Sequence, residues 1–409
     1  MWFVGVTRHY TFRTNCARKY RYFASFYQGI KLMKWIQLSR LQPDLWSVPR
    51  VLIVFTTQPY EALPISVLRT MYPELLIMGM SSHHGVFTPE GFKRGSYGLL
   101  FEGEEGERFC ASLMTFDADE DIREKVISSV SHLEPLSAER RFMMYCIPGF
   151  EERVIEGLRE VLGTRADVLG GSAGYDLFLE QPYVFLNDAM TSCGVLLAET
   201  DIAEYRSINA MAGYHLSEKR GIATRAQGRI LYEIDHRNAS AVYDEWTDGM
   251  FSTYLEHDGL LPRSAAKFPI GRLYQGNHEF GIWLTHVYGV QAHALMLFAE
   301  VAEGTEICLT RGSSKQILDN LKSAIDRELQ KVERQKVCGA LVYFCSGCTN
   351  LVAESIKQIS MSICESLGNI PFIGASTMGE QGCLSHQPLQ HGNMMIGITL
   401  FMQANPTLT

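Results

Sequence analysis

Long apolar runs are absent from this chain of 409 residues. No run reaches the roughly 18 to 20 residues that a membrane-spanning helix requires, so we expect no membrane span. The sequence also contains neither a Gly-x-x-x-x-Gly-Lys phosphate loop nor a Gly-x-Gly-x-x-Gly turn that leads from a strand into a helix. These absences argue against an integral membrane protein and a nucleotide cofactor, and we predict no cofactor and no metal.

Acidic residues are absent from the first 43 positions, which hold eight Lys or Arg; the first acid is Asp44. An Arg-rich, acid-free leader is typical of an organellar transit peptide. We therefore predict a basic leader over residues 1–47 and a mitochondrial location, with an ordinary basic tail on a cytoplasmic protein as the alternative. Of the 37 basic residues, 29 remain for the rest of the chain, against all 45 acidic ones. This acidic remainder would repel phosphate, so we expect no nucleic-acid partner.

One pattern occurs three times: an apolar strand, a helix, a second strand that ends in Gly-x-Ser, and a return strand with an apolar-Gly-apolar step. The three Gly-x-Ser segments are Gly79-Met80-Ser81, Gly170-Gly171-Ser172 and Gly374-Ala375-Ser376. The return-strand glycines are Gly98, Gly194 and Gly397. Such internal similarity indicates a reused β-α-β-β unit.

The length and the 46% hydrophobic content predict a globular protein of two or three domains. Strands outnumber helices and many connections are short, which favours an α/β fold with an α+β tendency. We expect two domains of mixed or antiparallel sheets flanked by helices, over residues 48–210 and 228–409. Apolar periodicity predicts helices over 121–132, 151–162 and 315–332, and a helix that starts near Ala239. The polar stretch 209–227 shows little periodicity and is predicted to be a linker.

Two ordered sets of motifs resemble the FIST family, which has an N-terminal and a C-terminal FIST domain. The N-terminal signature is matched by Gly170-Gly171-Ser172-Ala173-Gly174-Tyr175-Asp176, Tyr183-Val184-Phe185-Leu186-Asn187 and Gly194-Val195-Leu196-Leu197. The C-terminal signature is matched by Gly228-Arg229-Ile230-Leu231-Tyr232, Phe268-Pro269-Ile270-Gly271, Val301-Ala302-Glu303-Gly304-Thr305, Phe344-Cys345-Ser346-Gly347, Gly374-Ala375-Ser376-Thr377-Met378-Gly379-Glu380 and His391-Gly392.

The resemblance implies a non-enzymatic sensory module in signal transduction that holds a small ligand, for which amino acids are proposed. In animals a similar pair of domains follows an F-box and recruits substrates to a ubiquitin ligase. The first fifty residues show no recognisable F-box: Leu45 to Pro49 contain a leucine and a proline, but a strand pattern over Val51 to Phe55 replaces the helical pattern expected after them. An adaptor that binds ubiquitin-ligase subunits is therefore the alternative function.

Catalysis by Ser172 is the minor alternative. Gly170-Gly171-Ser172-Ala173-Gly174 satisfies Gly-x-Ser-x-Gly, but a nucleophile elbow needs a helix directly after the serine, and a strand pattern follows here. Serine also recurs at the equivalent place in all three copies, and three nucleophiles are not expected. We predict no catalytic residue.

Two further groups have possible metal or redox chemistry. Cys345-Ser346-Gly347-Cys348 lacks a second pair of cysteines for a structural zinc site, which leaves a redox pair or buried, pocket-edge thiols. His83 and His84 follow the first Gly-x-Ser turn, where a solvated loop is the simpler interpretation than a metal site.

We predict that the glycine turns of both halves converge on a polar-rimmed pocket between the domains. Gly170, Gly171 and Gly374 would let backbone amides approach the ligand, and Ser172, Ser376 and Thr377 would supply hydroxyls. A carboxylate would bind an amino group of the ligand. The carboxylate candidates and the other predicted ligand-binding residues are Asp176, Glu380, Gly174, Gly379 and Cys345.

Overall fold

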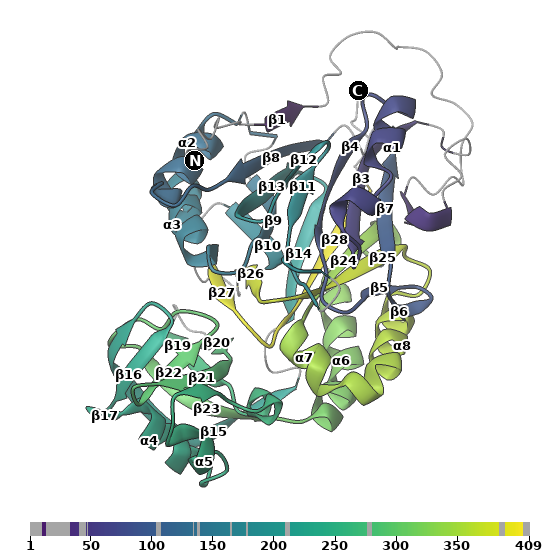
Figure 1. Ribbon diagram of the computed structural model, residues 1–409. Helices are drawn as coiled ribbons and strands as arrows, with labels where there is room; N and C mark the ends of the chain where they lie inside the picture. Colours follow the sequence, from purple (N-terminus) through teal and green to yellow (C-terminus); the bar gives the residue numbers. More distant parts are fainter. Residues whose placement is uncertain are drawn as a thin grey trace.

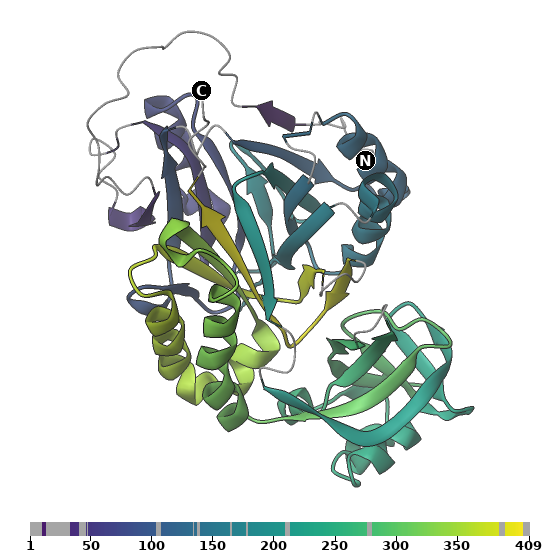
Figure 2. The same cartoon turned by 180° about the vertical axis from the view of Figure 1, so that it is seen from behind.

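The chain divides into a body and a smaller lobe (Figure 1). The computed structural model describes residues 10–13, 33–40, 46, 48–103, 108–133, 135–136, 140–163, 166–176, 179–208, 213–275, 280–383 and 389–403. The lobe comprises residues 214–312, which are inserted in the sequence between two elements of the body. Figure 2 shows the C-terminal hairpin, in yellow, between the lobe and the rest of the body.

The body is built from three units with the predicted strand–helix–strand–strand order. Unit 1 comprises β3 (Pro49–Thr56), α1 (Ile65–Met71), β4 (Leu76–Ser81), β5 (Val86–Thr88), β6 (Gly91–Lys93) and β7 (Ser96–Glu102). Unit 2 comprises β9 (Arg140–Cys146), α3 (Glu151–Leu162), β10 (Ala166–Ser172), β11 (Val184–Leu186), β12 (Ala189–Thr191) and β13 (Gly194–Thr200). Unit 3 comprises β24 (Val337–Cys345), α7 (Ser346–Leu351), α8 (Ile356–Leu367), β25 (Phe372–Thr377), β26 (Glu380–Gly382), β27 (Gln390–Gly392) and β28 (Ile396–Met402).

Each unit has the same strand pairing. Its first two long strands are parallel and its last strand is antiparallel to the first. A further strand extends each unit on the side of its last strand. These outer elements, with the helices that precede units 2 and 3, are β1 (Tyr10–Arg13), β2 (Met33–Gln37), β8 (Phe109–Thr115), α2 (Ile122–Ser131), β14 (Ala203–Ile208) and α6 (Ser314–Leu329).

The short hairpin of each unit joins the sheet of another unit. Strand β5 of unit 1 pairs with β25 of unit 3, β26 of unit 3 pairs with β10 of unit 2, and β11 of unit 2 pairs with β4 of unit 1. The exchange therefore closes a ring of three sheets. Because these sheets mix strands from both halves, and β14 lies beside β28, the predicted ranges 48–210 and 228–409 do not correspond to separate sheets.

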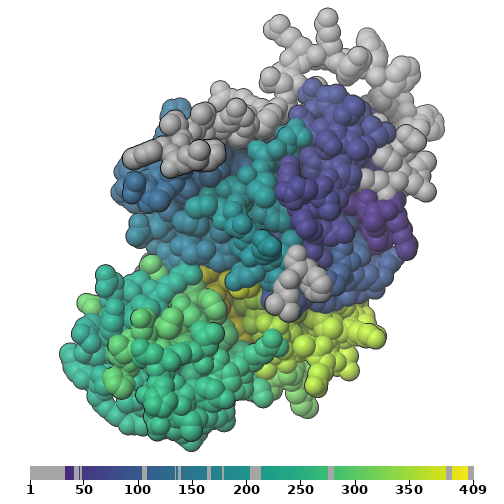
Figure 3. Space-filling view, viewed as in Figure 1, coloured from purple at the N-terminus to yellow at the C-terminus, as the bar shows by residue number. Residues whose placement is uncertain are grey.

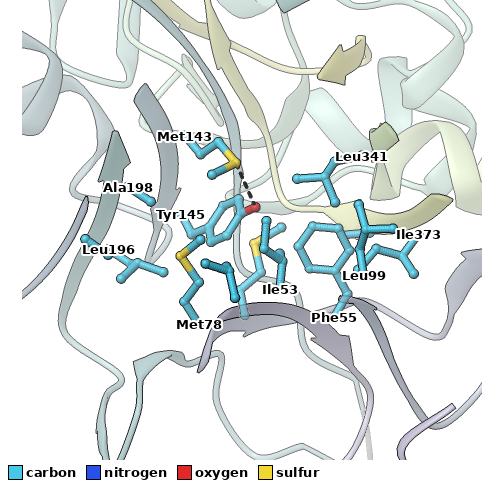
Figure 4. Close-up of a cluster of buried hydrophobic side chains, with 14 of the residues drawn as sticks. Ile53, Phe55, Met78, Leu99, Met143, Tyr145, Leu196, Ala198, Leu341 and Ile373 are labelled. Carbon is cyan, nitrogen blue, oxygen red and sulfur yellow. Dashed lines mark hydrogen bonds between the residues drawn. The ribbon is translucent and has the colours of Figure 1, made fainter. Parts of the chain in front are cut away.

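The main core lies inside this ring of sheets. Phe55, Tyr145 and Tyr343 occupy equivalent places in β3, β9 and β24, each one residue after the partner of a Gly-x-Ser glycine. Their ring centroids are 5.7 Å apart for Phe55 and Tyr145 and 6.1 Å apart for the other two pairs. Figure 4 shows apolar side chains from all three units packed around Tyr145. Helices cover the outer faces: α1 on unit 1, α2 and α3 on unit 2, and α6 and α8 on unit 3 (Figure 1).

The lobe has its own sheet and its own core. Its core includes the buried side chains of Tyr243, Phe251 and Leu295. Its elements are β15 (Tyr214–Gln227), β16 (Ile230–Ile234), β17 (Arg237–Asn238), α4 (Ala239–Trp246), α5 (Ser252–Leu255), β18 (Gly259–Leu260), β19 (Ile270–Gln275), β20 (Phe280–Thr285), β21 (Val287–Gln291), β22 (Ala294–Leu297) and β23 (Glu306–Gly312). Short 3-10 turns occur in the lobe at Arg263–Lys267 and in the body at Leu38–Arg40, Tyr60–Ala62, Arg334–Lys336 and Ala353–Ser355.

The predicted α/β fold class and the repeated unit are confirmed, but two details of the sequence interpretation are wrong. Most of the predicted linker 209–227 is the long strand β15, which pairs with both β16 and β23. Its register shifts, and most of its side chains are not buried, so the sequence shows no regular alternation. The return-strand glycines are also not equivalent, because Gly98 faces Val54 whereas Gly397 faces Tyr343.

Part of the predicted leader belongs to the folded body. Strand β2 pairs with β7, and Met33 at its start is 1% exposed within the main core. Trp35 stacks on Tyr97 of β7. Strand β1 pairs with β8 at the edge of another sheet. Among the described residues, no helix is long and apolar enough to cross a membrane.

Candidate functional site

The three Gly-x-Ser corners meet in the folded chain. The Gly174 N–H donates to the Ser81 carbonyl at 2.9 Å, and the His83 N–H donates to the Ser376 carbonyl at 2.9 Å. The Ser172 N–H donates to the Gly379 carbonyl, also at 2.9 Å. Corners from both halves of the sequence are thus hydrogen-bonded to one another.

The predicted glycines allow this close approach of protein segments. A Cβ atom at Gly171 would lie 2.3 Å from Cγ2 of Thr377, and one at Gly174 would lie 2.3 Å from the backbone nitrogen of His83. The remaining predicted glycines, with the groups that their Cβ atoms would meet, are Gly170 with the Met144 carbonyl, Gly374 with Phe87 and Val342, and Gly379 with His391. Whether any of these backbones also contacts a ligand stays a prediction.

The three equivalent serines have different partners. Ser81 bonds to the backbone of Tyr183, and the Ser376 hydroxyl lies 3.0 Å from that of Thr349. Ser172 instead donates to Oε1 of Glu151 at 2.5 Å. Of these three serines, Ser172 is the one whose hydroxyl contacts a carboxylate. The repeated architecture is therefore specialised at this place.

Around Ser172 lies a polar group that we call the interface cluster, because it joins the body to the lobe. The body contributes the first residues of α3, the end of β10 and the hairpin β26–β27, and the lobe contributes residues before β16, on β19 and on β20. In Figure 3 the yellow C-terminal segment is visible as a strip where the lobe meets the body. The interface cluster comprises Glu151, Glu152, Ser172, Arg229, Arg272, Trp283, Gln381 and His391.

A salt-bridge pair links the two parts at one side of the cluster. Nη2 of Arg229 lies 2.7 Å from Oε2 of Glu151 and 2.6 Å from Oε2 of Glu152. Burial would raise the pKa of Glu152, but the charge and hydrogen bonds of Arg229 and the Glu300 backbone N–H outweigh it and lower the pKa. Burial alone would lower the pKa of Arg229. Glu151 and Glu152 outweigh burial and raise the pKa above its ordinary value, so the guanidinium stays charged. The Glu151 carboxylate is fully buried and also accepts from the Gly149 N–H.

A neutral hydrogen-bonded chain continues from Ser172. Nε2 of Gln381 donates to the Ser172 hydroxyl at 2.9 Å and lies 3.1 Å from Nδ1 of His391. Burial lowers the pKa of His391, which keeps the imidazole neutral. Its Nε2 lies 3.2 Å from the Phe298 carbonyl, so the proton is assigned to Nε2 and Nδ1 accepts. The Ser172 hydroxyl is therefore bonded to a carboxylate and an amide, and residues 173–176 after it form no helix, unlike a nucleophile elbow.

Arg272 and Trp283 complete the cluster from the lobe. They are cross-strand partners on β19 and β20 and are 3% and 0% exposed. Nη1 of Arg272 donates to the Glu300 carbonyl at 2.6 Å and Nη2 donates to the His391 carbonyl. Within the described part of the chain, Nε of Arg272, Nε1 of Trp283 and Oε1 of Gln381 are buried without a hydrogen-bond partner. Such atoms are uncommon in folded proteins and call for an explanation.

Asp176 lies at a different contact between corners. Its carboxylate, 1% exposed, is 2.7 Å from Nη2 of Arg94 and 3.3 Å from Nδ1 of His84. His83 bonds through Nδ1 to the Tyr175 carbonyl at 2.5 Å. Asp176 therefore already faces positive charge from the protein itself.

Glu380 and Cys345 form a second buried group beside the cluster. Oε1 of Glu380 accepts from the Thr377 hydroxyl at 2.6 Å, and Oε2 accepts from the Met395 N–H at 3.2 Å. Burial raises the pKa of Glu380 to about 8, although these bonds lower it in part. Burial also raises the pKa values of the Cys345 and Cys348 thiols, which disfavours reactive thiolates. In the part of the chain that is described, no group of three or more His, Cys, Asp or Glu could hold a metal.

A cavity of about 480 Å³ opens at the other end of unit 3. Its cations already have partners: Arg334 donates to the Ser366 carbonyl and Lys336 pairs with Glu333. Its lining residues are Arg334, Gln335, Lys336, Val337, Cys338, Leu367, Gly368, Asn369, Ile370, Pro371 and Gln403. None of the predicted site residues lines it, and we favour the interface cluster as the candidate site.

The sequence interpretation missed most of the cluster. Glu151 was visible only as the start of a helix, and Gln381 follows a motif residue without belonging to a recognised pattern. Arg229 lies 78 residues from Glu151, and no local signal predicts that they pair. His391 and Arg229 were part of the family motifs but had no assigned role.

Two protein-family models match this chain. The family model of the FIST N domain matches residues 50–237, and that of the FIST C domain matches residues 239–383. The comparison with curated proteins found no match. A crystal structure described as a chorismatase aligns over 90% of this chain and 97% of that chain, with 9% identity and a TM-score of 0.33, too low to carry an argument. With the two domains matched in tandem, the chain belongs to the FIST family.

Proposed function

We propose that this chain is a non-enzymatic sensor that binds a small polar metabolite, such as an amino acid, at the interface cluster. The family supports this proposal, because FIST domains are generally sensory domains for small ligands. The observation that carries the proposal is that, of the three equivalent corner serines, Ser172 donates to a buried carboxylate that is paired with a cation of the lobe. The predicted site residues Ser172, Gly379 and Glu380 lie in or directly beside this group.

The energetics of the cluster support a binding role over a structural one. A buried ion pair rarely stabilises a fold more than well-packed apolar side chains would, because both charges lose their hydration. The equivalent corners of units 1 and 3 hold neutral partners at their serines. The charges at Glu151 and Arg229 therefore require a reason other than folding, and recognition of a polar ligand supplies one.

The position of the cluster couples binding to movement of the lobe. Most of its side chains are buried, and Arg229 and Glu152 are partly exposed, so we infer that a ligand enters when the lobe separates from the body at this side. The first and last residues of the lobe, Tyr214 and Gly312, pair with each other and form what we call the neck. Apolar side chains of the lobe pack with Cys345 and Cys348 there. We infer that the apolar neck acts as the hinge and the Arg229 salt bridges as the latch, and that ligand-dependent closure provides the signal.

A thermal-shift screen with amino acids and small carboxylates tests the proposal. We expect a concentration-dependent rise in Tm for the wild type, because a ligand that binds only the folded state stabilises it. Gln381→Met removes hydrogen bonds at the centre of the cluster and should abolish the rise. The exposed Gln330→Met, at the end of α6, should keep it. No rise in the wild type, or an equal rise in Gln381→Met, would count against the proposal.

Two predictions from the sequence remain proposals. The adaptor function predicts that ubiquitin-ligase subunits copurify stoichiometrically with the chain. The mitochondrial location predicts that residues 1–32 direct a fluorescent protein to mitochondria. Neither is favoured by a particular contact in the structure.

A further inference from the structure

Arg272 is a buried arginine that has no carboxylate within salt-bridge distance among the described residues. Its side chain is 3% exposed, and its two terminal nitrogens donate to backbone carbonyls of Glu300 and His391. Across the described residues it makes no salt bridge with a carboxylate, and its Nε–H has no acceptor. The other cation of the cluster, Arg229, is already held by Glu151 and Glu152. Arg272 is thus the cluster's available positive charge.

Trp283 provides a second donor next to this charge. It lies directly opposite Arg272 in the β19–β20 ladder and is fully buried. Its ring packs on the hairpin of the body, 2.7 Å from where a Cβ of Gly392 would lie. Its Nε1–H lacks an acceptor among the residues that the structure describes. Arg272 and Trp283 therefore offer two N–H donors and a positive charge on the same face of the lobe.

Gln381 provides an acceptor on the facing hairpin. Its amide nitrogen is committed to Ser172 and to His391, so its orientation is fixed. Its Oε1 is fully buried and, over the described ranges, accepts no hydrogen bond. Arg272 donates to the backbone carbonyl of His391, and the ring of His391 contacts Gln381. Arg272 and Gln381 therefore both contact His391, from the lobe and from the hairpin.

We propose that Arg272 and Trp283 bind the carboxylate of the ligand and that Gln381 accepts a hydrogen bond from an amino or hydroxyl group beside it. The ligand class is then a small α-amino or α-hydroxy acid. A guanidinium is the preferred partner of a carboxylate in a buried site, since both charges and the donor geometry match. This inference rests on the proposed function of the interface cluster and specifies what it recognises.

Matched acids and amides test the inference. The probes are glycine and L-lactate, with glycinamide and lactamide as analogues that lack the carboxylate, measured by thermal shift and by calorimetric titration. We expect the acids to bind and the amides to bind at least about tenfold more weakly, because each loses its charge-assisted hydrogen bonds. Arg272→Gln should weaken acid binding by about tenfold or more. Trp283→Phe, which keeps the ring and removes one N–H, should weaken it several-fold.

The control is Arg220→Gln, which removes an exposed lobe cation paired with Glu306 and should leave binding unchanged. If Arg272→Gln does not fold, Trp283→Phe carries the test. Equal binding of acids and amides, or undiminished binding in a folded Arg272 or Trp283 variant, overturns the inference but leaves the proposed function standing. Binding of none of the probes overturns the inference, and the wider screen then decides the proposed function.

Discussion

Glu380 shows how a single side chain acquires its properties from packing. The sequence placed it after a glycine turn, where a carboxylate is ordinarily exposed and ionised. In the structure it is 2% exposed, and its hydrogen bonds to Thr377 and Met395 do not offset the loss of water. Its charge near neutral pH is therefore decided by burial, which no local pattern reports.

The raised pKa of Glu380 predicts a pH dependence of stability. Between its ordinary pKa of 4.5 and the folded value of about 8, the folded state holds a proton that the unfolded state has released. The free energy of unfolding should therefore decrease as the pH rises through this window. Glu380→Gln cannot titrate, so its Tm should fall less than that of the wild type between pH 5 and 8. The exposed Glu354→Gln should follow the wild type, and a wild-type slope in Glu380→Gln would contradict the assignment.

We expect a side chain at position 174 to clash with the backbone where the corners meet. An added Cβ would lie 2.3 Å from the His83 nitrogen and 2.8 Å from the Ser376 carbonyl oxygen, which are backbone atoms of two other corners. We expect Gly174→Ala to lower the free energy of unfolding by about 2–3 kcal/mol, measured by urea denaturation. Gly339→Ala is the control, because its Cβ would first meet the flexible end of Met33 and should cost less. Equal effects would show that the corners can move apart.

Secondary-structure elements were predicted correctly where their signal in the sequence is local. The helix predicted over 151–162 is α3 with those limits, and the helix predicted over 315–332 is α6, capped by Ser313 accepting from the Gln316 N–H. Amphipathic periodicity and capping act within a few residues, so a sequence reveals them. Strand β15 gave no such signal, because its pairing on both edges depends on strands that follow it along the chain.

Strand β2 predicts where the leader can end. It contributes five residue pairs to β7, and it places Met33 in the main core. A chain that lacks residues 1–32 should keep this strand, whereas one that lacks residues 1–47 loses it. We expect the longer deletion to cost at least about 2 kcal/mol more in urea denaturation, as loss of a buried methionine alone would. If both deletions are equally stable, β2 is dispensable and the predicted boundary at 47 is compatible with the fold.

At the scale of the whole molecule, the lobe and the body are joined by contacts of different kinds. Apolar side chains pack near the neck, and the far side is held by Arg229 on Glu151 and Glu152. Glu152 also accepts from the Glu300 N–H of the lobe at 3.0 Å. A polar contact opens more readily in water than an apolar one, which fits a latch that responds to a polar ligand.

We expect Arg229→Gln to weaken the attachment of the lobe to the body. The substitution leaves the fully buried Glu151 carboxylate without its cation, which should cost about 3–5 kcal/mol. Hydrogen–deuterium exchange should rise at the start of α3 and in β26–β27, and adding Glu151→Gln should recover part of the loss. Arg237→Gln, which breaks an exposed lobe pair with Glu245, should change stability by less than about 1 kcal/mol. Identical exchange in the two single variants would refute the latch.

The sequence alone determined the repeated unit, its Gly-x-Ser corners, the long helices and the family, because these follow from local periodicity, turn chemistry and ordered motifs. Tertiary structure decided which unit each hairpin joins, and it brought together Glu151, Arg229 and Gln381. Gln381 lies 209 residues from its partner Ser172, and Arg272 lies 119 residues from His391. Contacts over such separations, and the burial that sets their charges, arise only when the three sheets close and the lobe docks, since they depend on the summed packing of the whole chain.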